Sequence, residues 1–401
     1  HGKLLGYDGP FLYQVVDTVV ECSGEAYPNL VEKRDFIKKV IRLEEERFIE
    51  TIDAGLEILT GLMEQYRENG VLPGDEAFRL YDTFGFPIDL TREILEEQGM
   101  KADEQRFEQL MEQQRQRARE ARAAAVDAGW DEGVLDTLPK ELVSRFIGYD
   151  QSEGVVRAMV LDGALADTLQ DGDENAIVIT DQTVFYPEGG GQVGDTGTMT
   201  NAHFSAQVLG TRKLADGKIL HLVSVTEGVL DLGDTVRLAI DTGRRMDTTR
   251  NHTATHLLNM ALRRVLGDHV TQAGSLVEPA RIRFDFTHFE ALTPEQLAEV
   301  ERLVNDAILS GTVTHISNMP LMQAKQLGAI ADFGEKYGEV VRVVEIPGLT
   351  TDLCGGCHLK NTAEAGLFKI LSESGISAGV RRIEAVTGHG LLHLLDSREQ
   401  T

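Results

Sequence analysis

Residues 250–259 read Arg-Asn-His-Thr-Ala-Thr-His-Leu-Leu-Asn, and the rest of the chain is organised around this stretch. His252 and His256 are four residues apart among apolar residues of helical spacing, so both imidazoles project from one face of a predicted helix. Neutral imidazole suits zinc, which takes four ligands from histidine, cysteine and carboxylate side chains. Further ligands stand about a hundred residues later, where 354–358 read Cys-Gly-Gly-Cys-His. Together the two stretches predict a zinc site with mixed histidine and cysteine ligands.

The alternative interpretation is a surface helix with two histidines and a separate glycine turn with buried cysteines. It leaves the clustering of Cys354, Cys357 and His358 unexplained, so we favour the metal site. No glutamate lies between the two helix histidines. The His-Glu-x-x-His arrangement of metalloproteases, with its built-in general base, is therefore absent.

Length and composition limit the class of protein. The chain has 401 residues, enough for two or three domains, and 42% of them are apolar, as is usual for soluble globular proteins. No apolar run approaches the roughly 20 residues that span a bilayer, so we expect no membrane segment. Only Cys22, Cys354 and Cys357 are cysteines, which argues for a reducing compartment and predicts a cytoplasmic location. The first residue is His rather than Met, so we expect a piece of a longer protein.

The formal net charge of −26 is unfavourable for binding nucleic acid. Contact with phosphate needs lysine and arginine, so an RNA partner would require local positive charge. The candidates are Arg115, Arg117, Arg119 and Arg122, the pair Arg263 and Arg264, and the pair Arg381 and Arg382. Each group is also typical of an ordinary solvated face.

The N-terminal third has the apolar spacing of helices. We predict them at 29–69, 75–83, 90–98 and 103–125. Gly85 and Pro87 separate two of these helices, and Asp89 can cap the one that follows. Residues 130–133 (Trp-Asp-Glu-Gly) and Leu138-Pro139 predict a connector. We therefore expect an all-helical domain over 1–148.

From 155 to about 240 the apolar residues alternate with period two, and Asp and Gly separate the runs. This pattern is typical of a small antiparallel barrel or sandwich, which we place at 149–245. Within it, Gly189, Gly190 and Gly191 permit positive φ and close approach of another backbone. They lack the Lys-Ser/Thr and the following helix of a phosphate-binding P-loop. Two interpretations stay open, a tight turn and a place where a substrate backbone lies close.

The last third begins with the histidine-bearing helix, predicted at 246–267. Strands and helices follow, and Thr293-Pro294 has the residues of a helix N-cap with proline at the first helical position. We expect an α+β domain over 246–401, which contains the zinc site and ends in the start of a linker. The predicted fold class is multidomain α+β, with a helical domain, a small β-barrel and this α+β domain.

Several motifs together resemble one family, in the same order along the chain. Residues 252–256, 354–358, 189–195 and 372–388 look like the editing domain of alanyl-tRNA synthetase. Residues 80–91 resemble the helical tRNA-recognition region of that enzyme. The zinc motif alone is shared with free-standing alanyl editing proteins and with threonyl-tRNA synthetase, so the helical segment is what points to the full synthetase.

The resemblance implies roles for particular side chains. The residues that match the family's zinc ligands are His252, His256, Cys354 and His358. The family usually has Thr where this chain has Cys357, so whether Cys357 contacts the metal stays open.

The remaining site residues concern the substrate. Thr255 and Gln272 match positions of the editing pocket, which we expect to be catalytic. Asp89 matches the acidic residue that reads the G·U pair in the acceptor stem of tRNA(Ala). We also expect contacts to the tRNA from Gly189, Gly190, Gly191, Arg381 and Arg382. The plainer interpretation is that Thr255 bonds to its own helix and that Gln272 lies on a strand edge.

The family's aminoacylation core and its C-terminal oligomerisation region have no counterpart in this sequence. ATP would serve only that absent core, so we expect neither aminoacylation nor oligomers from this chain. The expected partners are the acceptor stem of tRNA(Ala) and mischarged aminoacyl-tRNA.

The reaction that the resemblance implies is hydrolysis of the ester joining serine or glycine wrongly to tRNA(Ala). Zinc can lower the pKa of bound water toward about 7 or polarise a carbonyl. Four protein ligands make a closed site, so the metal either takes a fifth ligand or holds the substrate while other groups position the water. Alternatives are a stand-alone alanyl-tRNA editing deacylase, a non-catalytic tRNA-binding module with structural zinc, and a general metal hydrolase of small esters.

Overall fold

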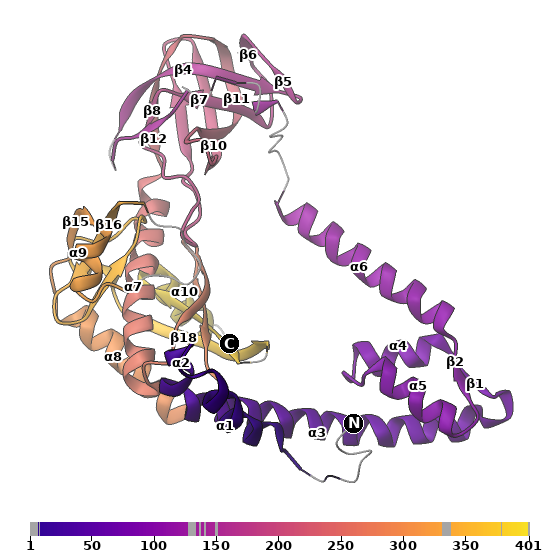
Figure 1. Cartoon of the computed structure of the whole chain (residues 1–401). Coiled ribbons are helices and arrows are strands. Elements are labelled where there is room, and N and C mark those ends of the chain that lie inside the picture. The colour runs from indigo at the N-terminus through magenta and orange to yellow at the C-terminus, as the bar shows by residue number, and fades with distance from the viewer. Residues whose placement is uncertain are drawn as a thin grey trace. The chain divides into compact units, whose positions relative to one another are not determined.

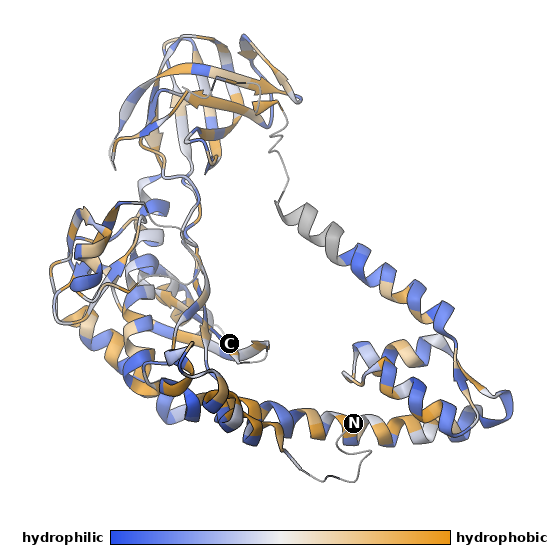
Figure 2. Cartoon of the chain, viewed as in Figure 1, coloured by the Kyte–Doolittle hydropathy of each residue, from blue (hydrophilic) through white to orange (hydrophobic). Residues whose placement is uncertain are grey.

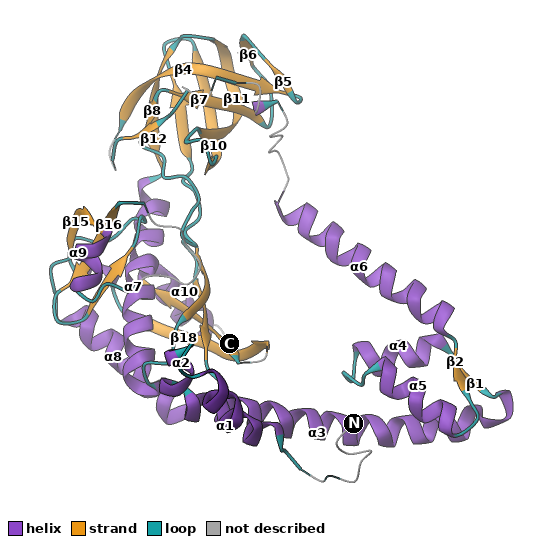
Figure 3. Cartoon of the chain, in the orientation of Figure 1, coloured by secondary structure: helices purple, strands orange, loops and turns teal. Residues whose placement is uncertain are grey.

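A computed structural model shows the chain and describes residues 7, 9–126, 134–135, 138–139, 142–148, 151–330, 338–377 and 379–399, with backbone alone at 118–126 and 398–399. The chain divides into two compact units, His1–Ala128 and Gly129–Thr401 (Figure 1). Each unit is described by itself. Figure 3 shows that helices dominate the first unit and that the second contains both helices and strands. No helix within the described ranges is long and apolar enough to cross a membrane.

The first unit is built from helices. They are α1 (Leu12–Ser23), α2 (Pro28–Glu32), α3 (Arg34–Tyr66), α4 (Gly74–Asp82), α5 (Ile88–Glu97), α6 (Glu104–Val126) and the short 3-10 helix η1 (Arg67–Asn69). The predicted helices are confirmed to within a few residues, except that 29–69 contains two helices that meet at Lys33. The prediction of an all-helical unit was wrong in one detail, because β1 (Val71–Leu72) and β2 (Lys101–Ala102) form a short parallel pair.

Some sequence predictions for this unit need a correction, and others concern residues outside the described ranges. Asp89 does not cap α5, because that helix begins one residue earlier, at Ile88, with Pro87 in the N-cap position. The missed helix α1 lies in an apolar segment for which we predicted no element. The predicted connector at 130–133 and the side chains of Arg119 and Arg122 lie outside the described residues.

The core of the first unit forms where α3, α4 and α5 pack together. Leu59 on α3, Leu80 on α4 and Leu95 on α5 are fully buried with Phe86. Figure 2 shows apolar and polar segments alternating along α3, as expected for a helix with one buried face. Gly55 lies on that face, and a Cβ there would collide with the ring of Phe86. The packing of α3 on Phe86 therefore requires glycine at this position.

The second unit begins with a closed antiparallel barrel. Its strands pair in the order β10 (Phe204–Lys213), β9 (Gly197–Thr200), β12 (Thr235–Ile240), β4 (Ser152–Leu161), β7 (Ala176–Thr180) and β11 (Ile219–Asp231), and β11 pairs with β10 to close the ring. Short strands lie beside it: β3 (Arg145–Phe146), β5 (Ala164–Leu165), β6 (Thr168–Gln170) and β8 (Gln182–Thr183). Of the two alternatives that the alternating pattern allowed, the fold is the barrel. Its inward residues, such as Val156, Met199 and Leu238, form one apolar core.

A buried histidine lies within the barrel wall. His221 is fully buried, its Nδ1 lies 3.0 Å from the carbonyl oxygen of Val178, and its Nε2 lies 2.8 Å from the hydroxyl of Thr183. Because a carbonyl only accepts, the proton is on Nδ1 and the threonine hydroxyl donates to Nε2. Burial lowers the pKa of His221 to about 4, although the bond to Val178 opposes the shift. The imidazole is therefore neutral at physiological pH.

After the barrel the chain forms α7 (Thr242–Leu266), which packs on a four-stranded antiparallel sheet ordered β13 (Gln272–Val277), β14 (Ile282–Thr287), β19 (Val380–Thr387) and β18 (Phe368–Ser377). A second sheet orders β15 (His315–Pro320), β16 (Val340–Ile346) and β17 (Thr350–Leu353). The other helices are α8 (Pro294–Leu309), α9 (Leu321–Gln326), η3 (Thr362–Ala365) and α10 (Gly388–Glu399).

The apolar face of α7 forms the core of this region with α8 and the first sheet. Leu257, Leu258 and Leu262 of α7 are fully buried beside Phe284 and Val300. The predicted N-cap of α8 is confirmed as a capping box between Thr293 and Gln296, with proline at N1. The chain thus has the expected mixture of helices, a barrel and an α+β region, while the domain boundaries at 148 and 245 stay a prediction.

We predict that two glycines of α3 respond in opposite directions to the same substitution. Gly55→Ala should destabilise the first unit by about 1–3 kcal/mol, because the added methyl collides with Phe86. Gly61→Ala should stabilise it by about 0.5–1 kcal/mol, because its Cβ meets no atom within 4 Å and alanine is the better helix former. Urea unfolding of both variants measures the difference. Equal effects would contradict the packing described.

We also predict that acid destabilises the barrel through His221. The unfolded imidazole takes up a proton near pH 6.5, whereas the folded one does so only near 4. The stabilising effect is thus complete above pH 6.5 and is lost as the pH falls toward 4. Between pH 7.5 and 5 the free energy of unfolding should fall by about 2 kcal/mol more in the unchanged chain than in His221→Phe. Parallel pH profiles would refute this assignment.

Candidate metal centre

The two helix histidines lie on one buried face of α7. Asp241 caps this helix, since its carboxylate accepts from the backbone N–H of Arg244 at 2.9 Å. The rings of His252 and His256 stack with centroids 5.4 Å apart. The i, i+4 spacing thus places the imidazoles next to each other, as the sequence predicted.

The turn at 354–358 follows β17 and is held against α7. Arg342 of β16 donates from Nη1 to the carbonyl oxygens of Cys354 and Gly356, each at 2.8 Å. Gly356 lies directly against the ring of His252, so that a Cβ at this position would collide with the imidazole. Glycine is therefore required for the turn to approach the helix.

Four side chains converge where the helix and the turn meet. The ligand atoms of His252, His256, Cys354 and His358 all lie within 4.8 Å of one another. The sulfur of Cys354 is 3.3 Å from Nε2 of His252 and 3.3 Å from Nε2 of His358. Nε2 of His256 is buried and has no hydrogen-bond partner among the described residues. A buried nitrogen of this kind is normally satisfied, and a metal ion would satisfy it.

Each imidazole of the cluster is oriented through its other nitrogen. Nδ1 of His252 lies 2.7 Å from Oε1 of Gln192, and Nδ1 of His256 lies 3.3 Å from Oδ2 of Asp352. Nδ1 of His358 lies 3.3 Å from the hydroxyl of Thr253. The oxygens of Gln192 and Asp352 only accept, so His252 and His256 carry a proton on Nδ1 and direct Nε2 toward the cluster, whereas the hydroxyl of Thr253 can donate or accept. The three histidines thus converge on the sulfur of Cys354.

Metal ligands must be unprotonated, and burial and charge favour that form at Cys354 and His358. Burial lowers the pKa of His358 to about 3, so its imidazole is neutral. Burial alone would raise the pKa of the Cys354 thiol, but the neighbouring His252 and His358 outweigh it and hold that pKa well below its usual range. Burial would lower the pKa of His256, but Asp352 and Cys354 outweigh it and raise that pKa well above its usual value, so a bound metal ion would have to displace this proton. The donor set of three imidazole nitrogens and one sulfur fits zinc.

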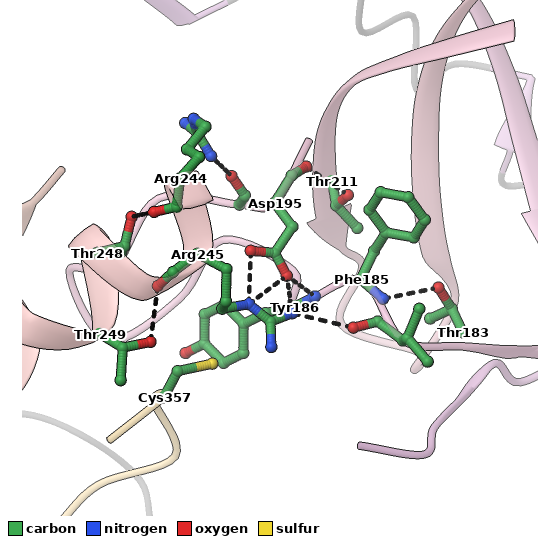
Figure 4. Close-up of polar contacts among 12 residues, drawn as sticks. Thr183, Phe185, Tyr186, Asp195, Thr211, Arg244, Arg245, Thr248, Thr249 and Cys357 are labelled. Carbon is green, nitrogen blue, oxygen red and sulfur yellow. Dashed lines mark hydrogen bonds and ion pairs between the residues drawn. The ribbon is translucent and has the colours of Figure 1, made fainter. Parts of the chain in front are cut away.

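Cys357 lies outside this cluster. It is buried, and its backbone N–H donates to Oε1 of Gln192 at 2.9 Å. Burial raises the pKa of its thiol to about 11, so it stays protonated. Figure 4 shows its sulfur beside Tyr186 and Arg245. The converging group among the described residues does not include Cys357.

The glycine-rich loop is fixed to α7 by a buried ion pair. Nε of Arg245 lies 2.8 and 2.9 Å from the two carboxylate oxygens of Asp195, and Nη2 of the same arginine donates to the carbonyl of Val184 at 3.0 Å (Figure 4). Gly191 packs so tightly on Ser275 of β13 that a Cβ would collide with it. The close backbone approach predicted for the glycines is thus, at Gly191, an approach to this chain's own strand.

Sequence reasoning missed Gln192, Thr253 and Asp352. Gln192 is fully buried and uses one amide oxygen for both His252 and the backbone of Cys357. The signal was its place directly after three glycines, in a motif whose glycines alone we considered. Nothing in the local pattern marked Asp352, which lies on β17 two residues before Cys354.

The predicted substrate residues lie in different surroundings. Thr255 is on α7, where its hydroxyl donates to the carbonyl of Asn251 at 2.8 Å, as in the plainer interpretation. Gln272 begins β13 and its amide lies 3.5 Å from the hydroxyl of Ser275. Asp89 on α5 is 87% exposed and pairs with Arg92 at 3.0 Å. Their roles toward a substrate stay predictions.

The predicted RNA-contacting arginines on β19 each meet a carboxylate. Arg381 is 14% exposed and lies 2.5 Å from Glu373 on β18. Arg382 binds Asp285 of β14 through two nitrogens, at 2.7 and 2.8 Å. Both guanidinium groups are therefore already neutralised across the sheet, and contact with RNA would have to share or displace these pairs.

We predict that Gln192 controls metal affinity. Gln192→Leu removes the acceptor that orients His252, and loss of such an outer partner typically weakens metal binding 10–100-fold. Gln192→Glu keeps an acceptor oxygen and should retain most of the affinity. The exposed Gln207→Leu on the barrel is the matched control. Chelator competition with zinc measures all three, and equal affinity in Gln192→Leu would contradict this role.

Comparisons with known proteins agree with the motifs. Residues 1–244 match the family profile described as tRNA synthetases class II (A). Residues 341–384, which include the Cys354 turn, match the threonyl and alanyl tRNA synthetase second additional domain.

Relatives match over the whole chain. The alanine–tRNA ligase of Clostridioides difficile (strain 630) is 50% identical over 403 residues, which is 100% of this chain and 46% of the relative. The corresponding enzymes of Alkaliphilus oremlandii (strain OhILAs) and Acetivibrio thermocellus (strain ATCC 27405) are 50% and 48% identical, again over 100% of this chain and 46% of each relative. The chain thus spans about half the length of these relatives. It belongs to the alanyl-tRNA synthetase family.

Proposed function

We propose that this chain binds tRNA(Ala) and hydrolyses the ester of serine or glycine wrongly attached to it. The observation that supports this most directly is the convergence of His252, His256, Cys354 and His358, three of them oriented through Nδ1. It occurs in a chain whose relatives are named alanine–tRNA ligases. A cytoplasmic location stays a prediction.

The four converging side chains would hold a zinc ion. When bound, the ion would supply a positive centre that polarises a carbonyl or a water. Three imidazoles and a thiolate complete a tetrahedral set, which is typical of closed zinc sites. We therefore assign choice of substrate and orientation of water to neighbouring protein groups rather than to an open metal position.

Choice between serine and alanine needs a group that bonds the extra hydroxyl. A site built for such a bond disfavours the analogue that lacks it, because its polar groups are left unpaired. Gln272 at the start of β13 and Thr255 on α7 are our candidates. Thr255 already donates its hydroxyl to the carbonyl of Asn251, so the proposal assigns the larger part to Gln272.

The RNA itself would be recognised by other parts of the chain. We propose that Asp89 reads the acceptor stem, because its carboxylate is the exposed one at the start of α5. Further proposed contacts are Gly189, Gly190, Gly191, Arg381 and Arg382. ATP is proposed only for the aminoacylation reaction of the longer relatives.

A second candidate function is a tRNA-docking module with a structural zinc. The closed set of four donors favours it. Both candidates bind zinc and tRNA, so metal content does not separate them. A general hydrolase of small esters differs in turning over free aminoacyl esters without RNA.

We predict that the zinc-loaded chain releases serine from Ser-tRNA(Ala) and leaves Ala-tRNA(Ala) intact. Cys354→Ala should abolish release, since it removes the one thiolate of the cluster, whereas Cys22→Ala in the exposed part of α1 should have no effect. Gln272→Ala should slow release by about 10–100-fold with zinc content unchanged. Radiolabelled serine release measures each rate. Tight tRNA binding with intact Ser-tRNA(Ala) would establish the docking module instead.

A further inference from the structure

A pocket of about 460 Å³ opens beside the C-terminal half of α7. It lies between that helix, the turn joining β16 to β17, and the backbone near Gly328. None of the four converging side chains lines it, so it is separate from the candidate metal centre. It belongs entirely to the second unit.

The walls of the pocket combine apolar and cationic groups. Met260, Ile346 and Leu349 give apolar surface, and Met260 and Ile346 are buried. Arg263 and Arg264 from the last turn of α7 also line it. Binding pockets commonly pair an apolar lining with a few charged groups that fix orientation. A nucleotide offers both matching parts, a flat base and an anionic phosphate.

Arg263 and Arg264 each have more N–H donors than their hydrogen bonds within the chain use. Arg263 bonds to Oδ1 of Asp268 at 3.3 Å, and the aspartate side chain is 97% exposed. Arg264 donates to the carbonyl of Gly348 at 3.2 Å. A guanidinium has five N–H donors and matches phosphate geometry, and each of these bonds uses one donor. Such an exposed pair as Arg263–Asp268 is weak, so phosphate can compete with it.

The pocket is linked directly to the candidate metal centre. Met260 follows His256 by four residues, about one helical turn and about 6 Å along the axis. Thr350 also lines the pocket, and its hydroxyl donates at 2.7 Å to Oδ2 of Asp352. The same carboxylate oxygen faces Nδ1 of His256 at 3.3 Å. A ligand in the pocket therefore lies next to the group that orients one of the converging imidazoles.

We propose that this pocket binds a nucleotide at the 3′ end of the charged RNA, with its phosphate on Arg263 and Arg264 and its base against Met260, Ile346 and Leu349. The inference rests on the proposed function, because it identifies where the RNA end lies when its ester reaches the cluster. It also locates positive charge in a chain of net charge −26. Contacts to phosphate supply most of the affinity of proteins for nucleic acid.

The competing explanation is that both arginines only stabilise the C-terminal end of α7, where positive side chains are favoured by the helix dipole. In that case their removal lowers the free energy of unfolding and leaves RNA affinity unchanged. The two explanations therefore differ in a measurement of binding and its dependence on salt.

The test uses the zinc-loaded chain and tRNA(Ala) that carries serine through a non-hydrolysable 3′ amide. Arg263→Gln and Arg264→Gln should each weaken binding about tenfold and reduce the slope of log affinity against log salt by about one. Asp268→Asn should tighten binding, because it frees Arg263 from its carboxylate. Arg302→Gln on the surface of α8 is the matched control and should change neither quantity.

The outcomes separate this inference from the proposed function. Unchanged affinity and salt slope in both arginine variants, or no gain in Asp268→Asn, would overturn the pocket assignment even if Ser-tRNA(Ala) is hydrolysed. Arginine-dependent binding of the amide analogue together with intact Ser-tRNA(Ala) would keep the pocket and overturn the hydrolase. A short 3′-CCA oligonucleotide that competes with the analogue in the unchanged chain, and not in the double variant, would support the assignment further.

Discussion

The buried ion pair between Asp195 and Arg245 holds the candidate site together. It joins a loop of the barrel to the first turn of α7, and both side chains are almost fully buried (6% and 4% exposed). Each partner also bonds to the backbone: Asp195 accepts from the N–H of Tyr186, and Arg245 donates to the carbonyl oxygen of Val184. Removing one partner of such a pair leaves an uncompensated buried charge, which costs about 3–5 kcal/mol. The loop is consequently held in one position on the helix.

That position makes Gln192 part of the cluster. The residue lies three positions before Asp195, in the same loop, and its amide oxygen meets His252 and the backbone N–H of Cys357. One oxygen thus connects the barrel loop, α7 and the turn at 354–358. Arg342 also holds this turn, through the carbonyl oxygens of Cys354 and Gly356. Preorganisation of this kind keeps ligand atoms converged, and it reduces the cost of ordering them when a metal binds.

The cluster also shows how burial and charge act in opposite directions on neighbouring groups. Burial favours neutral imidazole at His358 but disfavours the thiolate of Cys354. The adjacent His252 and His358 outweigh burial and lower the pKa of Cys354, which favours its thiolate. Cys357 lies three residues later and outside the cluster, and burial keeps it protonated. Sequence spacing offers both cysteines equally, so the difference arises from what each side chain faces.

Local patterns in the sequence were sufficient for much of this protein. Helical spacing located α3 to α6, and period-two alternation located most barrel strands. The motifs at 252–256 and 354–358 supplied five candidate donors, and the family resemblance implied the four of them that converge. These features follow from side-chain direction along a helix or strand, which neighbouring residues determine. The closure of the barrel, which distinguishes it from a sandwich, needed the pairing of β10 with β11.

Tertiary structure alone decided which groups surround the donors. Gln192 lies 60 residues from His252 in sequence, and Thr253 lies 105 residues from His358. Contacts over such separations leave no periodic trace, because they depend on how finished elements pack. For the same reason the sequence marked Arg381 and Arg382 as available cations, whereas the sheet pairs each with a carboxylate from a neighbouring strand. The sequence by itself determined the donors and the elements that carry them; packing of distant segments decided their orientation, their charge and their partners.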